Sequence, residues 1–274
     1  MTVATTDFPY LQRLVFERAA IVLADDKEYL LESRLQPVAR QLGLDSAETL
    51  MERVRQTRDP ALEERVVEAM TTNETLWFRD VHPFNALRRC IIPDLMSRRA
   101  GSRRLSLWSA ACSSGQELYS LAMLLGESFP DVLGWELTLL GTDYSTEMVA
   151  RARAGRYSTL EINRGLPAPM LVRNFNHEGA HYRINDDIRR LVTFRQMNLA
   201  GPWPPVPRFD VIMVRNVLIY FDLPTRKRIL ESAADHLEPG GYLFIGSSET
   251  MMGVTDVFEA QTAEGATFYR LKGK

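Results

Sequence analysis

The segment 105–125, LSLWSAACSSGQELYSLAMLL, constrains the fold more than any other stretch of the chain. It begins as an apolar run, which is typical of a strand buried on both faces of a sheet. A turn of small residues follows at 110–115 and is compact enough to let a ligand approach the main chain closely. From Gln116 onward the apolar residues recur at helical spacing. Strand, small turn and helix together predict the first unit of a nucleotide-binding α/β fold, with the ligand outside the carboxyl end of the strand.

The composition is that of a globular chain and argues against several functional classes. The 274 residues are 45% hydrophobic and 25% charged, and the formal net charge of -2 provides no overall basic field for nucleic acid. The two cysteines, Cys90 and Cys112, allow at most one disulfide, and no segment resembles a signal peptide or a membrane span. We therefore expect a cytoplasmic protein without membrane insertion or a nucleic-acid partner. His177 and His181 are four residues apart but lack neighbours with metal-ligand spacing, so no metal site is predicted.

The chain divides into two parts with different sequence patterns. Residues 7–70 show helical periodicity, with Asp45-Ser46 and Asp59-Pro60 as breaks between helices, which predicts a helical domain over residues 1–72. The second domain, 73–274, alternates apolar runs with helical segments and ends in a hairpin pattern around Glu264-Gly265. This pattern predicts a mostly parallel sheet with an antiparallel edge. Clear periodicity is lost after 156, which predicts a small excursion from the main fold at about 165–194.

Four polar features lie where predicted strands end. They are the 112–115 turn with Glu117, and then Asp143, Asn198 and Asn216. A helix cap or a satisfied turn residue would explain any one of them. Four of them at matching strand ends favour a binding site, because the carboxyl ends of parallel strands meet at one edge of the sheet.

The residue types at this edge favour a nucleoside without phosphates. An acid at the end of the second strand is the usual acceptor for two ribose hydroxyls, and Asp143 has that place. The 110–115 turn lacks the three glycines that bring the main chain close to a pyrophosphate. The pattern therefore indicates S-adenosylmethionine rather than a nicotinamide dinucleotide. Glu117 is then expected to face the ammonium group or the sulfonium region of the ligand.

Five motifs, found in the same order, resemble those of the CheR family of chemotaxis-receptor glutamate methyltransferases. They are TTNETLWFR (71–79), SAACSSGQELYSLAM (109–123), GTDYSTEMVARARAGRY (141–157), RNVLIYFD (215–222) and PGGYLFIGSSE (239–249). The resemblance covers nearly the whole chain, including the helical part. It implies a class I S-adenosylmethionine-dependent methyltransferase (Rossmann-like) sheet, an all-helical N-terminal domain that recognises the receptor, and a small antiparallel β excursion.

The resemblance also implies an activity and a set of site residues. The family transfers a methyl group from S-adenosylmethionine to glutamate side chains on the cytoplasmic helical bundle of methyl-accepting chemoreceptors. This reaction yields S-adenosylhomocysteine and the glutamyl methyl esters of chemotactic adaptation. Arg79 and Tyr220 are the expected catalytic residues near the transferred methyl group. The cofactor contacts that carry over are Asn73, Thr75, Arg79, Glu117, Asp143, Asn198, Leu199, Asn216 and Val217.

The chain departs from the family pattern within the excursion. Some members dock on a short aromatic peptide at the receptor C-terminus, through an Arg-Gly-x-Gly loop that precedes a His-Glu-Gly turn. Here the segment 173–179 reads RNFNHEG and lacks those loop glycines. Close approach of a peptide strand to the main chain is therefore harder, and we predict weak or absent binding of this pentapeptide tether.

Two other interpretations stay open on the sequence. A nucleic-acid amino-methyltransferase would carry an Asx-Pro-Pro-aromatic motif after the fourth strand, whereas the segment 216–220 contains no proline and the charge is balanced. A non-catalytic module that binds the cofactor would need neither Arg79 nor Tyr220. The alternative roles of these two residues are an interdomain salt bridge for Arg79 and a packed aromatic side chain for Tyr220.

Overall fold

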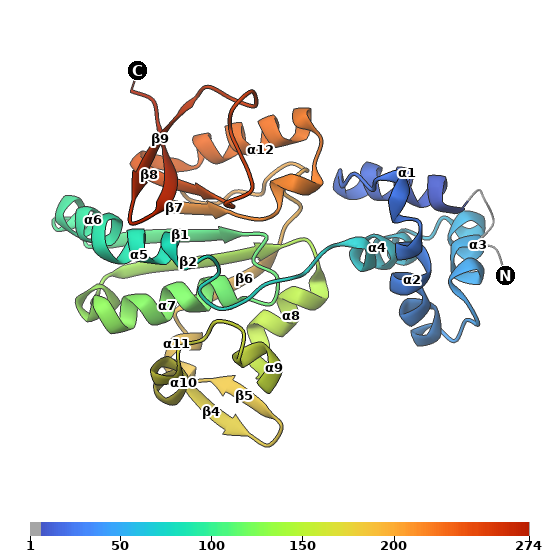
Figure 1. Ribbon diagram of the computed structural model, residues 1–274, viewed down its shortest axis with the longest axis horizontal. Helices are drawn as coiled ribbons and strands as arrows, with labels where there is room; N and C mark the ends of the chain where they lie inside the picture. Colours follow the sequence, from blue (N-terminus) through green and yellow to red (C-terminus); the bar gives the residue numbers. More distant parts are fainter. Residues whose placement is uncertain (1–6, 274) are drawn as a thin grey trace. The chain divides into compact units, whose positions relative to one another are not determined.

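The computed structural model describes residues 7–273 and divides into two compact units (Figure 1). The first unit extends to Thr72 and also includes Tyr220–Thr225, and the second comprises Asn73–Ile219 and the chain from Arg226 onward. The first unit is helical: α1 (Asp7–Ala19), η1 (Asp25–Lys27), α2 (Tyr29–Gln41), α3 (Ala47–Thr57) and α4 (Pro60–Met70). Polar caps fix two of its helix starts, since Ser46 accepts a hydrogen bond from the Thr49 N–H group and Asp59 accepts one from Ala61.

The second unit is built on a seven-stranded sheet with the strand order β6-β2-β1-β7-β8-β10-β9. The first five strands run parallel, and β10 is antiparallel to both of its neighbours. The strands are β1 (Arg104–Ala110), β2 (Glu136–Asp143), β6 (Val192–Gln196), β7 (Phe209–Val214), β8 (Leu237–Ile245), β9 (Phe258–Ala263) and β10 (Ala266–Leu271). The predicted parallel sheet with an antiparallel terminal hairpin is thus confirmed.

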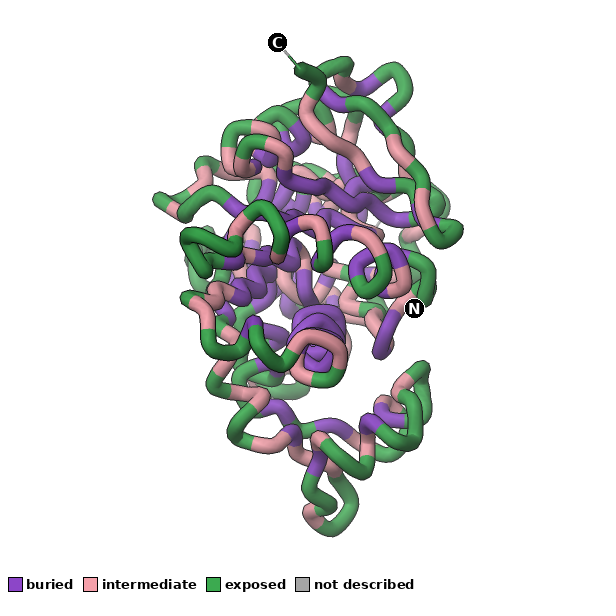
Figure 2. The backbone as a smooth tube through the Cα atoms, turned by 90° about the vertical axis from the view of Figure 1, so that its left-hand side faces the viewer, coloured by how far each residue is buried: buried purple, intermediate pink, exposed green. Residues whose placement is uncertain are grey.

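Apolar strands and one central helix form the core of this unit. All six residues of β7 are buried, and ten of the thirteen residues of α7 are buried as well. In Figure 2 the buried, purple stretches of the tube gather in the interior, and the exposed, green stretches lie mostly at the outside. A strand that is buried on both faces needs helices on both sides of the sheet, which explains the apolar run 211–214 in β7. The helices are α5 (His82–Ala86), η2 (Leu87–Ile91), α6 (Ile92–Arg99), α7 (Gln116–Ser128), η3 (Pro130–Gly134), α8 (Thr146–Ala154), η4 (Leu218–Tyr220) and α12 (Leu223–Asp235).

A three-stranded antiparallel sheet, with the order β3-β5-β4, forms the excursion between α8 and β6. Trp77 anchors it, because its ring makes edge contacts with both Tyr157 and Phe175. The excursion begins at Arg156, earlier than the predicted 165. The sequence did not indicate this start, because β3 has only three residues and shows no clear alternation of apolar and polar residues. Its elements are β3 (Arg156–Ser158), α9 (Thr159–Ile162), α10 (Ala168–Asn174), β4 (Phe175–Glu178), β5 (His181–Ile184) and α11 (Asp186–Arg189).

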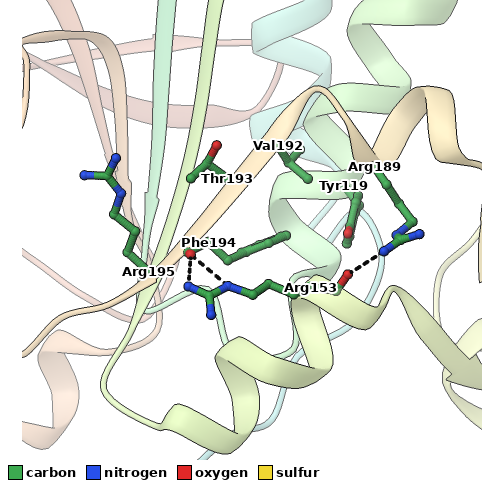
Figure 3. Close-up of a pocket in the computed structure, with 7 residues that line it drawn as sticks. All are labelled: Tyr119, Arg153, Arg189, Val192, Thr193, Phe194 and Arg195. Carbon is green, nitrogen blue, oxygen red and sulfur yellow. Dashed lines mark hydrogen bonds between the residues drawn. The ribbon is translucent and has the colours of Figure 1, made fainter.

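Arginines cover the outer edge of β6, the strand at one end of the large sheet (Figure 3). The Arg153 guanidinium donates hydrogen bonds to the Phe194 carbonyl oxygen at 3.1 and 2.7 Å, and Arg189 donates one to the Arg153 carbonyl oxygen at 3.0 Å. A cavity of about 340 Å³ lies beside these side chains. Because Arg153 occupies the Phe194 carbonyl group of β6, it restricts pairing of this edge with another strand.

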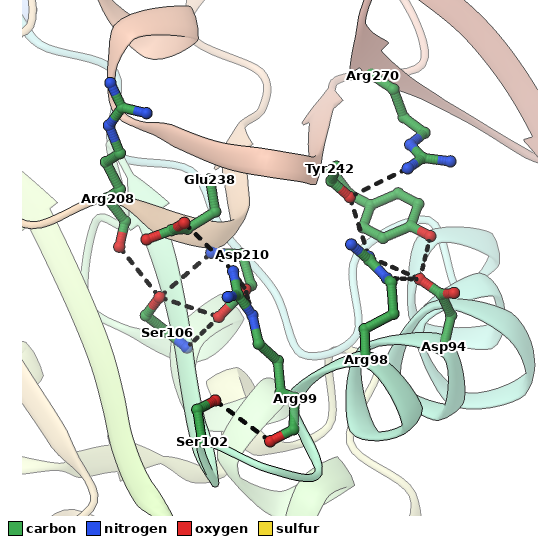
Figure 4. A network of polar contacts seen from close by, with 11 residues as sticks. Asp94, Arg98, Arg99, Ser102, Ser106, Arg208, Asp210, Glu238, Tyr242 and Arg270 are labelled. Carbon is green, nitrogen blue, oxygen red and sulfur yellow. Dashed lines mark hydrogen bonds and ion pairs between the residues drawn. The ribbon is translucent and has the colours of Figure 1, made fainter.

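A buried ion pair connects α6 to the amino-terminal ends of β1 and β7 (Figure 4). The Asp210 side chain is 4% exposed and accepts from Arg99 at 2.7 Å, while its second oxygen accepts from the Ser106 N–H group at 2.9 Å. Glu238, which is 31% exposed, contacts the same guanidinium at 3.3 Å. Asp210 is therefore the main partner of Arg99, and Glu238 is a peripheral one.

Replacing Asp210 by asparagine is expected to lower the free energy of unfolding by about 2 kcal/mol, because Arg99 loses its buried counter-charge. Glu238→Gln is the matched control and is expected to cost less than about 1 kcal/mol, since that contact is more exposed. Urea denaturation of the full chain measures both changes. Equal losses in the two variants would contradict the importance of burial at Asp210.

Candidate active site

The carboxyl ends of the parallel strands meet at one edge of the large sheet. Ala110, the last residue of β1, is in register with Thr142 of β2 on one side and with Val214 of β7 on the other. The chain order reverses between β1 and β7, and such a reversal leaves a crevice in which α/β proteins bind ligands. The predicted polar features follow the ends of β1, β2, β6 and β7, and the parallel pairing brings these four strand ends to the same edge.

The turn after β1 has a strained main chain. Ala111 and Ser113 have φ angles of 61° and 50°, a region that non-glycine residues rarely adopt. At Gly115, where φ is 92°, an added Cβ would lie 3.0 Å from both the Phe194 ring and the Ala152 side chain. Phe194 of β6 therefore packs beneath the turn and restricts this position to glycine. Strain of this kind persists where the surrounding structure fixes the conformation, and it is common at functional sites.

Asp143 fixes this turn from the end of β2. Its carboxylate accepts hydrogen bonds from the Ser113 N–H group at 2.7 Å and from the Ser145 N–H group at 3.0 Å. The Ser113 hydroxyl donates in turn to the Asn73 carbonyl oxygen at 2.7 Å, which brings two predicted contact residues to one place.

Glu117 has a charged partner within the chain. One carboxylate oxygen accepts from the Ser109 hydroxyl at 2.8 Å, and the other accepts from Arg215 at 2.6 Å. The same Arg215 guanidinium donates to Asp80 at 2.6 Å and to the Arg79 carbonyl oxygen at 3.0 Å. The sequence interpretation considered only a ligand cation opposite Glu117 and missed Arg215. The available signal was an arginine directly after the apolar residues 211–214, since a buried guanidinium needs a carboxylate nearby.

Arg79 lies in the segment that enters the second unit. The preceding Phe78 is fixed by its N–H group, which donates to the Ser120 hydroxyl at 3.1 Å. The half-buried Arg79 side chain donates to the Glu74 carbonyl oxygen at 3.0 Å and has no ion pair among residues 73–219 of its own unit. A guanidinium has five N–H donors, so most of them remain available to a ligand. Thr75 is half-buried in the same segment.

The strand ends after β6 and β7 hold the remaining predicted contacts. The Asn198 side-chain oxygen accepts from the Ala200 N–H group at 2.9 Å, and Leu199 is buried. Asn216 has a φ of 58°, and its N–H group donates to Glu249 at 2.9 Å. Glu249 is the last residue of the 239–249 motif, and no role in the site was predicted for it. It follows β8 and orders the Asn216 turn, which includes the half-buried Val217.

Tyr220 belongs to the other unit by its contacts. It lies in the 220–225 segment, and its carbonyl oxygen accepts from the Val22 N–H group at 2.8 Å. Phe221 forms an isolated antiparallel bridge with Ile21. Of the predicted site residues, Tyr220 is thus assigned to the helical unit and the others to the second unit.

The charge of this edge suits a cationic ligand better than a phosphate. The 111–115 turn carries no cationic side chain, and the Asp143 carboxylate lies next to it, whereas the charge of Glu117 is balanced by Arg215. Burial, together with the nearby Asp143 and Glu117 charges, raises the pKa of the Cys112 thiol well above its ordinary value, so this cysteine stays protonated. An adenosyl sulfonium with its ribose on a carboxylate fits these acidic groups, whereas a pyrophosphate does not.

Residues 7–273 contain no group of three or more His, Cys, Asp or Glu side chains that would hold a metal ion. No helix within that range combines the length and the apolar character needed to cross a bilayer. The polar edge of the large sheet is therefore the candidate site.

Family models match both parts of the chain. The model described as CheR methyltransferase, SAM binding domain, covers residues 73–266, and the one described as CheR methyltransferase, all-alpha domain, covers residues 6–71. The first match includes every strand end described above. S-adenosylmethionine is therefore the cofactor, as the residue types at the sheet edge predicted.

Named relatives match over nearly their whole length. The chain is 40% identical to chemotaxis protein methyltransferase 1 of Pseudomonas aeruginosa, over 99% of this chain and 100% of that protein. It is 39% identical to the chemotaxis protein methyltransferase of Vibrio parahaemolyticus, over 99% of both chains. The Escherichia coli chemotaxis protein methyltransferase is 33% identical, over 99% of this chain and 92% of that protein. The chain thus belongs to the CheR methyltransferase family, whose named relatives here are chemotaxis protein methyltransferases.

Proposed function

We propose that this protein transfers the methyl group of S-adenosylmethionine to glutamate side chains of methyl-accepting chemoreceptors in the cytoplasm. The relatives' names support methylation in chemotaxis, and the observation that carries the choice of acceptor is Arg79. Its guanidinium follows a fixed main chain, has most of its N–H groups available, and pairs with planar carboxylates in a bidentate geometry. A carboxylate is therefore the acceptor that this site is best suited to hold.

The proposed chemistry needs no general base. A glutamate carboxylate is ionised at pH 7. When bound, S-adenosylmethionine supplies a methyl group on a sulfonium, and the carboxylate takes it in one in-line displacement that neutralises both charges. The chain's residues then have to align the partners and exclude water. Asp143 would hold the ribose, and Arg79 and Tyr220 would orient the acceptor. Arg79 should not bind the carboxylate too strongly, because only interactions that favour the transition state accelerate the reaction.

The direct test is incubation of the full chain with tritiated S-adenosylmethionine and a chemoreceptor cytoplasmic fragment. Base-labile label on the receptor is the expected result, because glutamyl methyl esters hydrolyse in alkali. A receptor fragment with its methylated-helix glutamates replaced by alanine is the control. Label on nucleic acid, or cofactor binding without transfer to the receptor, would contradict the proposal.

Arg79→Ala is expected to lower kcat at least about 100-fold, because one charged contact to the reacting carboxylate is lost. Tyr220→Phe is expected to lose less, since it removes a hydroxyl and no charge. Arg104→Ala is a suitable control and should stay within about twofold of wild type. Arg104 is 67% exposed at the start of β1 and pairs with a surface glutamate. A wild-type rate for Arg79→Ala would refute the assigned role.

We propose further that methylation does not depend on the receptor's pentapeptide tether. The Arg173 and Asn174 carbonyl oxygens accept hydrogen bonds from Asn185, from its side chain at 3.0 Å and its N–H group at 2.9 Å. These carbonyl groups are therefore already bonded in the region where the family loop would meet a peptide strand.

A pentapeptide with the aromatic pattern of such tethers is expected to bind the full chain with a Kd above about 100 µM. Receptor fragments with and without the tether should be methylated at the same rate, because binding would then rest on the helical bundle alone. Calorimetry measures the peptide affinity, and the transfer assay compares the two fragments. Submicromolar binding would show that the missing glycines are not required.

A further inference from the structure

The buried guanidinium of Arg215 connects the segment that carries Arg79 to the start of α7, which carries Glu117. The Arg215 side chain is 1% exposed and lies directly after β7. Its Nη1 group contacts Glu117 and its Nη2 group contacts Asp80, both at 2.6 Å. A buried charge is costly unless it is paired, and Arg215 is paired with carboxylates from two separate segments. Its position is therefore set by both segments at once.

The first segment carries Arg79 in a strained conformation. Phe78, Asp80 and Val81 have φ angles of 50°, 69° and 55°, a region that non-glycine residues rarely adopt. Arg215 donates to the Arg79 carbonyl oxygen at 3.0 Å and to the Asp80 carboxylate next to it. These two bonds fix the main chain at the residue whose side chain is proposed to hold the acceptor.

The second segment begins α7. Glu117 is two residues beyond the Gly115 turn, and its carboxylate lies between the Ser109 hydroxyl and the Arg215 guanidinium. Both oxygens thus have a donor, which fixes the orientation of the carboxylate and balances its charge. The Arg215 Nε atom is buried and has no hydrogen-bond partner among residues 7–273, so this geometry persists at a cost.

We propose that Arg215 is a positioning residue for methyl transfer, in which Nη2 holds the Arg79 segment and Nη1 holds Glu117, one of the predicted cofactor contacts. The proposal rests on the proposed function of Arg79. It predicts that the Glu117 contact affects cofactor affinity and that the Asp80 contact affects kcat. Loss of the Glu117 contact weakens cofactor binding. Loss of the Asp80 contact misplaces Arg79 and lowers kcat, while cofactor binding is retained. A lysine cannot make both contacts, because a single ammonium does not reproduce the planar fork of a guanidinium.

Three variants of the full chain separate positioning from simple stabilisation. Arg215→Lys removes the fork, Asp80→Asn removes the charge on the Arg79 side, and Arg99→Lys is the matched control. Arg99 belongs to the ion pair with Asp210 at the opposite ends of the strands (Figure 4). Each variant is measured for melting temperature, for S-adenosylhomocysteine affinity by calorimetry, and for kcat and KM with a receptor fragment.

Arg215→Lys is expected to weaken S-adenosylhomocysteine binding about tenfold and to lower kcat at least about tenfold. Asp80→Asn is expected to lower kcat about tenfold with the affinity within about twofold of wild type. Arg99→Lys is expected to lower only the melting temperature. If Arg215→Lys behaves like Arg99→Lys, Arg215 is merely structural and the proposal is overturned.

The two proposals can fail separately. If wild-type protein binds S-adenosylhomocysteine but does not methylate the receptor, the proposed function fails, and the affinity of the Arg215 variant still tests the Glu117 contact. If Arg215→Lys does not fold, Glu117→Gln and Asp80→Asn test the two contacts individually. An affinity loss for Glu117→Gln and a kcat loss for Asp80→Asn support the proposal, and the reverse pattern contradicts it.

Discussion

Parallel pairing around β1 is the constraint on which the site depends. β1 has β2 on one side and β7 on the other, and both pairs are in parallel register up to their last residues. The turns after these strands therefore open at the same edge, and the order reversal beside β1 leaves room for a ligand. The sheet itself, rather than a long flexible loop, places the main chain of Asp143 and Asn216.

The polar groups at this edge are held by bonds within the chain before any ligand binds. Asp143 accepts from two main-chain N–H groups, and Glu117 accepts from a serine and from Arg215. Groups that are already oriented need not reorganise when charge shifts during a reaction. This arrangement suits a displacement in which a cation and an anion neutralise each other, because alignment is the main requirement.

Much of this architecture follows from local sequence signals. The apolar run before the 110–115 turn, the acid after the second strand and the terminal Glu264-Gly265 hairpin all predicted elements that the structure contains. These signals are local, because burial on both faces and turn chemistry act over a few residues. The family motifs predicted the cofactor, S-adenosylmethionine. The residue types of the chain indicated the same cofactor, because the 110–115 turn lacks the three glycines that bring the main chain close to a pyrophosphate.

Other features depend on contacts between distant segments, and a local pattern does not identify both partners of such a contact. The contact of Glu117 with Arg215 joins residues 98 positions apart, and the strained Phe78–Val81 main chain is fixed by contacts beyond its own segment. The short β3 strand is defined by its pairing with β5 rather than by its composition. The contacts that group Tyr220 with the helical unit are of the same kind, since Val22 is its partner.

The division of the chain has a consequence for any attempt to separate its parts. The polypeptide passes between the two units at 72–73, again at 219–220 and once more at 225–226. A fragment that starts at Asn73 would keep Tyr220–Thr225 but lose Ile21 and Val22, its backbone partners. The segment Tyr220–Thr225, only a few residues beyond Asn216, thus completes the helical unit. Dividing the chain between residues 72 and 73 would therefore leave neither half with its full set of native contacts.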